Sequence, residues 1–207
     1  MKGAVEQKKY RKNGAEAKEI VVQRKPGWQQ GTKPTFLIIA PHAGSIEVNT
    51  YRQAREFHEQ VAELGGATTW IFGGEKGDQS AFDTWHVPST KISGRKPQFD
   101  LLEEHVEGRS YYQGVSFHGY SKDGILIGGQ HRVEWKELIA DGLRRALPVN
   151  IPVEIATRSG EYAGLSDSNI INRLSDSAIQ VEQSKRVRKR YWDTVVDVLA
   201  TLYSESS

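Results

Sequence analysis

The chain lacks cysteine and has no apolar run that approaches the ~18 residues of a membrane-spanning helix. Without cysteine there are no disulfides or thiolate metal sites, so any metal has to be bound by imidazole, carboxylate or backbone groups. The formal net charge is only +2, which disfavours a dedicated nucleic-acid-binding protein. The basic N-terminus has no apolar segment typical of a secretory signal. We therefore expect the chain, as written, in the cytoplasm, or outside the cell after release or removal of a signal.

Basic residues are concentrated at the N-terminus. Residues 1–31 contain eight Lys/Arg and three Glu, with few apolar residues, and the turn-rich segment "KPGWQQGTKP" at 25–34 indicates the boundary. This composition predicts a basic N-terminal arm over 1–31, in which "EIVVQ" can add an edge strand. Residues 32–207 are long enough for one domain with a sizeable core.

From residue 35 onward, short apolar segments alternate with amphipathic ones. We predict strands at 35–40, 67–74, 114–120, 124–130, 151–157 and 177–184, and helices at 51–66, 97–108, 132–148, within 164–175 and at 185–204. Residues 75–85 are expected as a loop, and 86–92 as a short strand or an extended segment. Such alternation indicates a three-layer α/β domain whose central mixed, largely parallel sheet is flanked by helices.

Side chains that can bind a metal lie at the ends of three predicted strands. The first ends at His42, with Glu47 close behind, the second carries His118, and the third carries Glu182. Because strand ends converge on one rim of an open α/β sheet, we expect these groups to meet. Two imidazoles and a carboxylate form a familiar catalytic zinc set with a fourth position for water, and Glu182 could act as general base. Taken singly, a histidine such as His42 or His118 is more often polar surface or a turn partner, and Glu182 can belong to a polar strand face.

Amide and guanidinium groups form a second candidate cluster. Asn172 and Arg173 lie near Asn169 on one predicted helix face, where Arg suits a substrate carboxylate geometrically. Helix capping and surface charge are the alternatives. Arg186 and Arg188 follow Glu182 in the basic run "KRVRKR", so one of them could point toward the rim while the others form a solvated helix face.

Six segments resemble, in order and spacing, the phage and bacterial poly-γ-glutamate hydrolases over about residues 36–188: "APHAGSIEVNT", "WHVPSTKI", "VSFHGY", "ILIGGQ", "SNIINR" and "IQVEQSKRVR". The resemblance implies a compact relative of the zinc carboxypeptidases. It assigns His42, Glu47 and His118 as zinc ligands and Glu182 as catalytic base. It also implies that His86, Asn172 and Arg173 are site or substrate residues. The chain differs from ordinary zinc carboxypeptidases in its longer His-to-Glu spacing and in the later position of the Asn-Arg pair.

The residues and the resemblance together predict a zinc-dependent hydrolase that cleaves the γ-amide linkage of poly-γ-glutamate. We expect Zn²⁺ as cofactor, an anionic γ-glutamyl polymer or peptide as partner, no nucleic acid, no membrane and a monomeric chain. The alternative is a zinc amidohydrolase or carboxypeptidase that uses the same site on a small N-acyl amino acid or short peptide. A nucleic-acid-binding module is disfavoured because aromatic and basic residues are not interleaved.

Overall fold

A computed structural model of the chain describes residues 4–24, 35–75, 79–92, 99–156 and 162–206. The strands are β1 (Ala4–Lys12), β2 (Ala15–Arg24), β3 (Phe36–Gly44), β4 (Ala67–Gly74), β5 (Tyr111–Gly119), β6 (Ile125–Gly128), β7 (Val153–Ile155) and β8 (Ser175–Gln183). The helices are α1 (Thr50–Val61), the short η1 (Ala62–Leu64), α2 (Gln79–Trp85), α3 (Asp100–His105), α4 (Val133–Ala146), α5 (Ile170–Leu174), α6 (Lys185–Arg190) and α7 (Trp192–Glu205).

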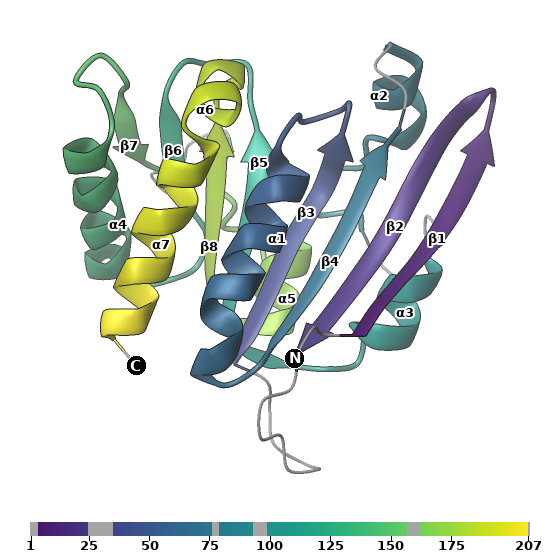
Figure 1. The fold of residues 1–207 in the computed structure, drawn as a ribbon, viewed down its shortest axis with the longest axis horizontal. Coiled ribbons are helices and arrows are strands. Elements are labelled where there is room, and N and C mark those ends of the chain that lie inside the picture. The colour runs from purple at the N-terminus through teal and green to yellow at the C-terminus, as the bar shows by residue number, and fades with distance from the viewer. Residues whose placement is uncertain (1–3, 25–34, 76–78, 93–98, 157–161, 207) are drawn as a thin grey trace.

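The strands form one mixed sheet in the order β1-β2-β4-β3-β5-β8-β6-β7. The central strands β4, β3, β5 and β8 are parallel to one another, and β2 and β6 join them antiparallel on either side. The carboxyl ends of the central strands therefore lie at the same rim, at the top of Figure 1. The predicted α/β class with a mixed, largely parallel centre is confirmed.

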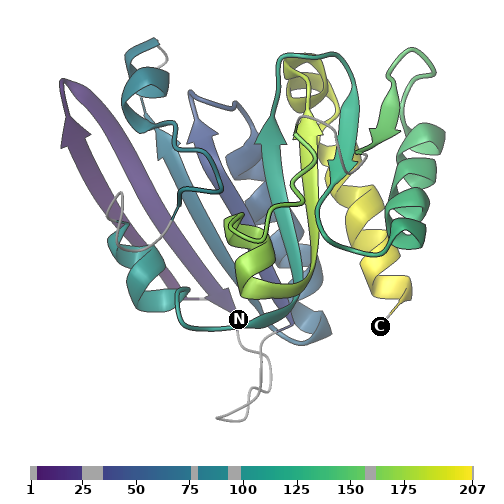
Figure 2. The ribbon, with the colours of Figure 1, turned by 180° about the vertical axis from the view of Figure 1, so that it is seen from behind.

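Helices cover both faces of the sheet. On one face α1, α4 and α7 pack together, and Phe57, Leu143 and Leu199 lie in the larger buried cluster (Figure 1). On the other face α3 and α5 contribute Leu102 and Ile171 to a second cluster (Figure 2). Burial of apolar surface on both sides, at roughly 25 cal/mol per Å², is the main force that holds the three layers together. In the described part of the chain, no helix has the length and apolar character needed to cross a bilayer.

Residues 4–24, predicted as part of a basic arm, form a β-hairpin that extends the sheet. Asn13 and Gly14 both have positive φ angles, 50° and 78°, as a two-residue hairpin turn requires. β2 pairs antiparallel with β4 and buries Ile20 opposite Ile71. The strand expected at "EIVVQ" lies within β2, whereas β1 was not predicted, because its basic and exposed residues resemble a solvated arm. The predicted boundary at residue 31 lies outside the described residues.

Three local predictions are wrong. Residues 79–85, expected as a loop, form α2, whose Trp85 packs against the second apolar cluster. Residues 86–92, expected as a short strand or an extended segment, contain no strand and form a turn at 89–91. The single helix expected at 185–204 is divided into α6 and α7 by Tyr191, whose φ of −135° is not helical.

A β-bulge in β3 redirects the strand just before the rim. Between Ala40 and Ala43, β3 advances by one residue more than its neighbour β4. Both alanines pack in the cluster on the α1 side. Strict alternation from Ala40 would direct His42 to that side as well, whereas the extra residue turns it to the opposite side, where its ring contacts the Val87 carbonyl. The bulge therefore determines where His42 points.

Candidate metal centre

Three side chains meet at the carboxyl rim of the sheet. His42 comes from β3, Glu47 from the loop after it and His118 from β5, and one ligand atom of each lies within 4.8 Å of the others. All three residues are buried, with exposed fractions of 3%, 6% and 4%. The structure therefore brings together the three residues that the sequence indicated as metal ligands.

A tight turn brings Glu47 back to His42. The backbone N–H of Glu47 donates to the carbonyl of His42 at 2.8 Å. Gly44 has a φ of 73°, and a Cβ at this position would lie 2.1 Å from the Gly74 carbonyl oxygen, so only glycine fits. Glycine is therefore required at this position both by the backbone angle and by the neighbouring strand.

Hydrogen bonds orient both imidazole rings. Nε2 of His42 lies 2.7 Å from the Val87 carbonyl, which can only accept, so this nitrogen carries the hydrogen. Nε2 of His118 lies 2.6 Å from the Ser116 hydroxyl. Each Nδ1 consequently faces Glu47, at 3.1 Å from His42 and 3.9 Å from His118. Contacts of this kind to the remote ring nitrogen fix metal-binding histidines in position.

The charges at this centre favour a cation. Burial lowers the pKa of His42, but the adjacent Glu47 carboxylate outweighs burial and leaves it raised. The pKa of Glu47 is lowered, because His42 and then His118 outweigh the effect of burial. Burial lowers the pKa of His118 to about 3, so this ring is neutral and keeps a nitrogen lone pair for a ligand.

One buried oxygen supports a metal at this position. Oε2 of Glu47 accepts no hydrogen bond from the described residues. Leaving such an atom unsatisfied costs on the order of 1–3 kcal/mol. A divalent cation between the carboxylate and the two Nδ1 atoms would remove this cost, and two imidazoles with one carboxylate are a common zinc donor set. The residues present therefore fit zinc.

Glu182 lies beside this centre on the neighbouring strand. It is opposite His118 in the β5–β8 pairing and is 5% exposed. Its Oε1 accepts from Gln180 at 3.0 Å, and Gln180 in turn accepts from Asn169 at 2.8 Å. Its Oε2 has no hydrogen-bond partner in the part of the chain that is described. Burial, and then the charge of Glu47, raise the pKa of Glu182 well above its usual value.

One cavity of about 460 Å³ connects these groups. Its lining includes His42, Glu47, His118 and Glu182, together with His86. The ring of His86 lies 4.1 Å from that of His42, centroid to centroid. The structure therefore places four of the residues expected from the resemblance, and His86 as a fifth, around the same space.

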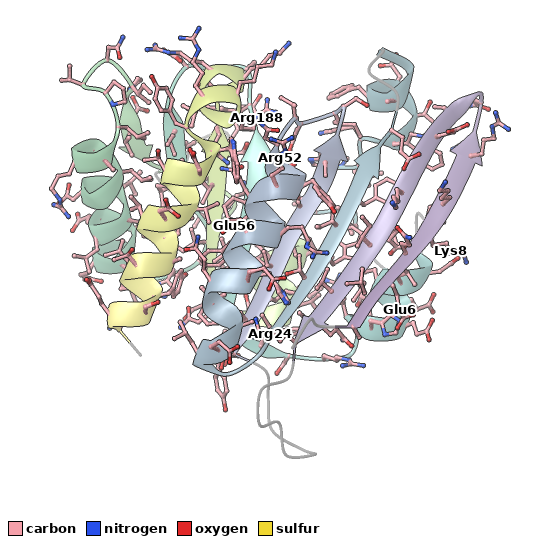
Figure 3. The ribbon with its side chains drawn as sticks, viewed as in Figure 1. Glu6, Lys8, Arg24, Arg52, Glu56 and Arg188 are labelled. Atoms are coloured by element: carbon pink, nitrogen blue, oxygen red, sulfur yellow. The ribbon has the colours of Figure 1, made fainter. Side chains whose placement is uncertain are left out.

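Arg188 borders the centre from α6. It is 6% exposed and donates to the carbonyls of Gln183 and Val48. A Cβ at Gly119 would lie 2.5 Å from its Cζ, so the missing side chain gives the guanidinium room at the end of β5. Burial lowers the pKa of Arg188, although the negative charges of Glu47 and Glu182 act in the opposite direction. Figure 3 shows Arg188 between α6 and the start of α1.

Among the predicted substrate residues, His86 lines the cavity, whereas Arg188 and the three remaining ones do not. Asn172 donates to the carbonyls of Gly164 and Ser166 and thereby holds the wall of the cavity. Arg173 forms a two-pronged ion pair with Glu107, with both distances 2.8 Å. Arg186 lies 3.1 Å from the amide oxygen of Asn150. Their predicted contact with substrate stays a prediction.

Two residues of the site were not identified from the sequence alone. Gln180 orients Glu182, and Ser116 orients His118. Each lies two residues before its partner on the same strand, so the period of two places both members of a pair on one face. Strand alternation was therefore the signal that could have identified them.

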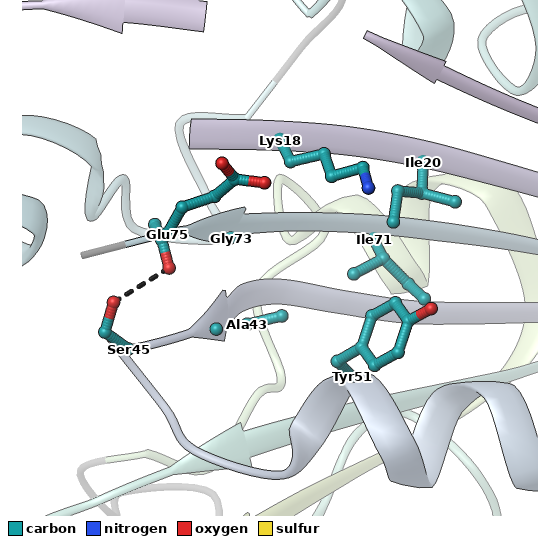
Figure 4. A pocket seen from close by; sticks show the side chains of 10 residues that line it. Lys18, Ile20, Ala43, Ser45, Tyr51, Ile71, Gly73 and Glu75 are labelled. Atoms are coloured by element: carbon teal, nitrogen blue, oxygen red, sulfur yellow. Dashed lines mark hydrogen bonds between the residues drawn. The ribbon is translucent and has the colours of Figure 1, made fainter. Parts of the chain in front are cut away.

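Another cavity, of about 580 Å³, lies on the α1 side of the sheet between β2, β3 and β4. Figure 4 shows its lining, which includes Lys18, Tyr51 and Glu75. None of its described lining residues is a histidine. It therefore offers a poorer metal site than the rim.

Comparison with known proteins places the chain in a sequence family. The sequence model of the poly-gamma-glutamate hydrolase family matches residues 15–198. The SPbeta prophage-derived UPF0714 protein YoqZ of Bacillus subtilis is 30% identical over 162 residues, which cover 76% of this chain and 52% of that protein. The UPF0714 protein YndL of the same organism is 28% identical over 161 residues, 76% of this chain and 56% of that protein. The chain thus spans about half the length of these curated relatives.

Solved structures share the fold. Zinc-free YndL has a TM-score of 0.64 at 22% identity, covering 91% of this chain and 90% of that one. A bacteriophage poly-gamma-glutamate hydrolase has a TM-score of 0.60 at 23% identity, covering 99% and 90%. A metallo-carboxypeptidase from Burkholderia cenocepacia has a TM-score of 0.53 at 9% identity, covering 89% and 60%. By its sequence match over most of its length, and with a carboxypeptidase-like α/β fold, the chain belongs to the poly-γ-glutamate hydrolase family.

Proposed function

We propose that the chain is a zinc-dependent hydrolase that cleaves the γ-amide linkage of poly-γ-glutamate. The observation that carries the proposal is the meeting of His42, Glu47 and His118 in a cavity that also contains Glu182. Family membership supports a hydrolase, and the γ-linked polymer is the substrate after which the family is described. The zinc, the polymer and the roles of the residues are the parts proposed here.

The three ligands have complementary tasks. His42 and His118 would offer their Nδ1 atoms and Glu47 its carboxylate, because the other ring nitrogens are occupied by Val87 and Ser116. When bound, zinc would supply Lewis acidity that polarises a scissile carbonyl and acidifies water. The burial of the ligands keeps bulk water away and strengthens every charge interaction at the centre.

Glu182 is the proposed general base. Its raised pKa makes its carboxylate a stronger proton acceptor than an ordinary glutamate. Gln180 holds one carboxylate oxygen, and the other is available to the attacking water. Glu182 would take a proton from that water as its oxygen bonds to the amide carbon. It would return the proton to the amine nitrogen as the C–N bond breaks.

Arg188 and His86 are the proposed substrate contacts. Arg188 presents a fixed, buried guanidinium next to both carboxylates of the site and would stabilise negative charge on the substrate. His86 is half-buried in the cavity lining and can hydrogen-bond a substrate carboxylate or amide. The basic side chains Lys185, Lys189 and Arg190 line a shallow pocket on α6 and would attract a polyanion in a salt-dependent way.

A hydrolase of small substrates is the second candidate. The cavity of about 460 Å³ holds a short ligand rather than a long stretch of polymer. A zinc amidohydrolase or carboxypeptidase acting on an N-acyl amino acid or a short peptide would use the same ligands and the same base. The two candidates therefore differ in the length of the preferred substrate.

The test starts with the metal content of the purified chain, measured by mass spectrometry. The chain is then incubated with poly-γ-glutamate, an N-acyl glutamate and a short peptide, each with and without a chelator, and products are separated by size. We expect about one zinc per chain and shortening of the polymer that chelator stops and added zinc restores. Preferred cleavage of the small substrates would favour the second candidate, and polymer cleavage that survives chelation would contradict the metal centre.

A further inference from the structure

A further cavity, of about 880 Å³, lies next to the candidate active site. Leu165 lines both spaces, so one stretch of chain separates them. This stretch is held by the backbone N–H of Gly129, which donates to Ala163, and by the side chain of Gln130, which donates to Leu165. Neighbouring backbones lie on the order of 5 Å apart, so an extended substrate that leaves the first cavity can reach the second.

A buried cation lines this second space, which we call the α4 cavity (Gly129, His131, Val133, Lys136 and Glu137). Lys136 is 5% exposed, and its ammonium donates to the Gly129 carbonyl at 3.2 Å. In the described part of the chain no carboxylate pairs with it. Burial lowers the pKa of Lys136, which means that its surroundings disfavour the charge. An ammonium with three N–H donors and one neutral acceptor still has capacity for an anion.

The start of α4 points to the same kind of ligand. α4 is 14 residues long, and its N-cap residue Arg132 makes no side-chain capping hydrogen bond. The first N–H groups of a helix lack intrahelical partners and carry the positive end of its dipole. Val133, the first residue of the helix, lines the cavity.

His131 adds an independent observation. It is 8% exposed, and its Nδ1 has no hydrogen-bond partner among the described residues. A buried ring nitrogen without a partner is costly, and a ligand that fills the cavity could satisfy it. Glu137 is the one acidic side chain among the described lining residues, and it is exposed.

We propose that the α4 cavity is a carboxylate-binding site, in which Lys136 and the free N–H groups at the start of α4 receive the carboxylate of a γ-glutamyl unit next to the one being cleaved. The identity of the ligand rests on the proposed function, since every residue of a γ-linked polymer keeps a free carboxylate. The inference that the ligand is negatively charged depends only on the residues that line the α4 cavity. The site would let the enzyme hold a long substrate on both sides of Leu165.

The experiment measures binding apart from turnover. In a Glu182→Gln background, calorimetry compares γ-glutamyl-glutamate with a longer γ-glutamyl oligomer for the parent chain and the variant Lys136→Met. Lys9→Met is the matched control, since it removes the same charge from the exposed strand β1. We expect Lys136→Met to weaken oligomer binding about tenfold and the control to weaken it less than about twofold. Lys136→Arg, which keeps the charge, is expected to retain most of the affinity.

If Lys136→Met and Lys9→Met weaken oligomer binding equally, the carboxylate site is refuted, because the loss then reflects only the overall charge of the chain. If Lys136→Met does not fold, the unaltered chain is titrated with glutarate while the amide resonances of Val133 and Glu134 are followed, and unchanged resonances would equally refute the site. A chain that binds the oligomer through Lys136 but cleaves no polymer would refute the proposed function alone. If the parent chain cleaves polymer and Lys136→Met binds the oligomer with unchanged affinity, the carboxylate site is refuted and the proposed function is not.

Discussion

Two buried carboxylates, Glu19 on β2 and Glu182 on β8, point to the same face of the sheet but have different surroundings. Glu19 is fully buried and accepts hydrogen bonds from Tyr10, from Trp70 and from the backbone N–H groups of Leu101 and Leu102 at the start of α3. Glu182 accepts from Gln180 through one oxygen, and its other oxygen has no partner among the described residues.

The difference separates a structural role from a chemical one. A carboxylate whose oxygens are fully hydrogen-bonded stabilises the fold, because it caps α3 and ties it to the sheet. A carboxylate with a free oxygen in a cavity is destabilising by itself, but that oxygen can take a proton from a ligand. Burial alone therefore does not identify a functional acid; the unsatisfied atom beside a cavity does.

The variant Glu182→Gln should show the largest effect. We expect its turnover of poly-γ-glutamate to fall by about 10²–10⁴-fold, because the amide cannot accept the proton of water. Its free energy of unfolding should be unchanged or slightly higher, since a buried charge is removed. Steady-state kinetics and urea unfolding of the same preparation give both values. Normal turnover would rule out Glu182 as the base.

The matching variant Glu19→Gln should show the opposite pattern. The amide group turns one acceptor into a donor that faces other donors, so we expect a loss of about 2–4 kcal/mol in the free energy of unfolding. Turnover per folded molecule should stay near that of the parent chain. Denaturant unfolding and kinetics under conditions where both proteins are folded test this. A loss of turnover in Glu19→Gln without a loss of stability would contradict the structural role assigned to Glu19.

Gln180→Leu tests how strongly the orientation of Glu182 matters. The leucine cannot donate to Oε1, so the carboxylate should lose its fixed direction and kcat should fall about 10–100-fold, with a smaller change in KM. The variant Gln180→Glu keeps the shape but not the donor and should not restore activity. Wild-type kcat in Gln180→Leu would show that the rest of the cavity suffices to position the base.

His58 tests whether a buried atom without a hydrogen-bond partner indicates function when its residue lines none of the cavities described above. Its Nδ1 bonds Thr69, its Nε2 has no hydrogen-bond partner in the described residues, and burial lowers its pKa from 6.5 to about 4. The unfolded chain therefore binds the proton more readily than the folded one. Stability is complete above pH 6.5 and should decline by about 2–3 kcal/mol as the pH falls to about 4. His58→Asn should flatten this part of the unfolding-versus-pH curve and leave turnover unaltered; an unchanged slope would assign the pH dependence to other groups.

The sequence predicted the centre of the fold and of the site because both depend on strand patterns. The apolar runs before His42 and His118 identified β3 and β5, whose carboxyl ends meet at the same rim of the sheet. The strand expected at "EIVVQ" lies in β2, but β1 was missed because basic residues on an exposed strand resemble a solvated arm, although Asn13-Gly14 is a strong turn signal.

Side-chain contacts between residues far apart in the chain could not be predicted from the sequence. Arg173 suited a substrate carboxylate in type, but it is engaged by Glu107, 66 residues earlier in the chain. Whether a charged side chain on a helix faces a cavity or a partner depends on tertiary packing, which local spacing does not encode. For the same reason Arg188 reaches the centre, whereas Arg186, two residues earlier, lies near Asn150.

The bulge in β3 gives the strand a required length as well as a required composition. Deletion of Ala43 would restore regular pairing with β4 and leave His42 in strict alternation with Ala40. His42 would then point into the packed layer beneath α1, and the sheet would keep its order while the metal centre lost a ligand. Two chains with identical site residues can therefore differ in activity through the count of residues between them.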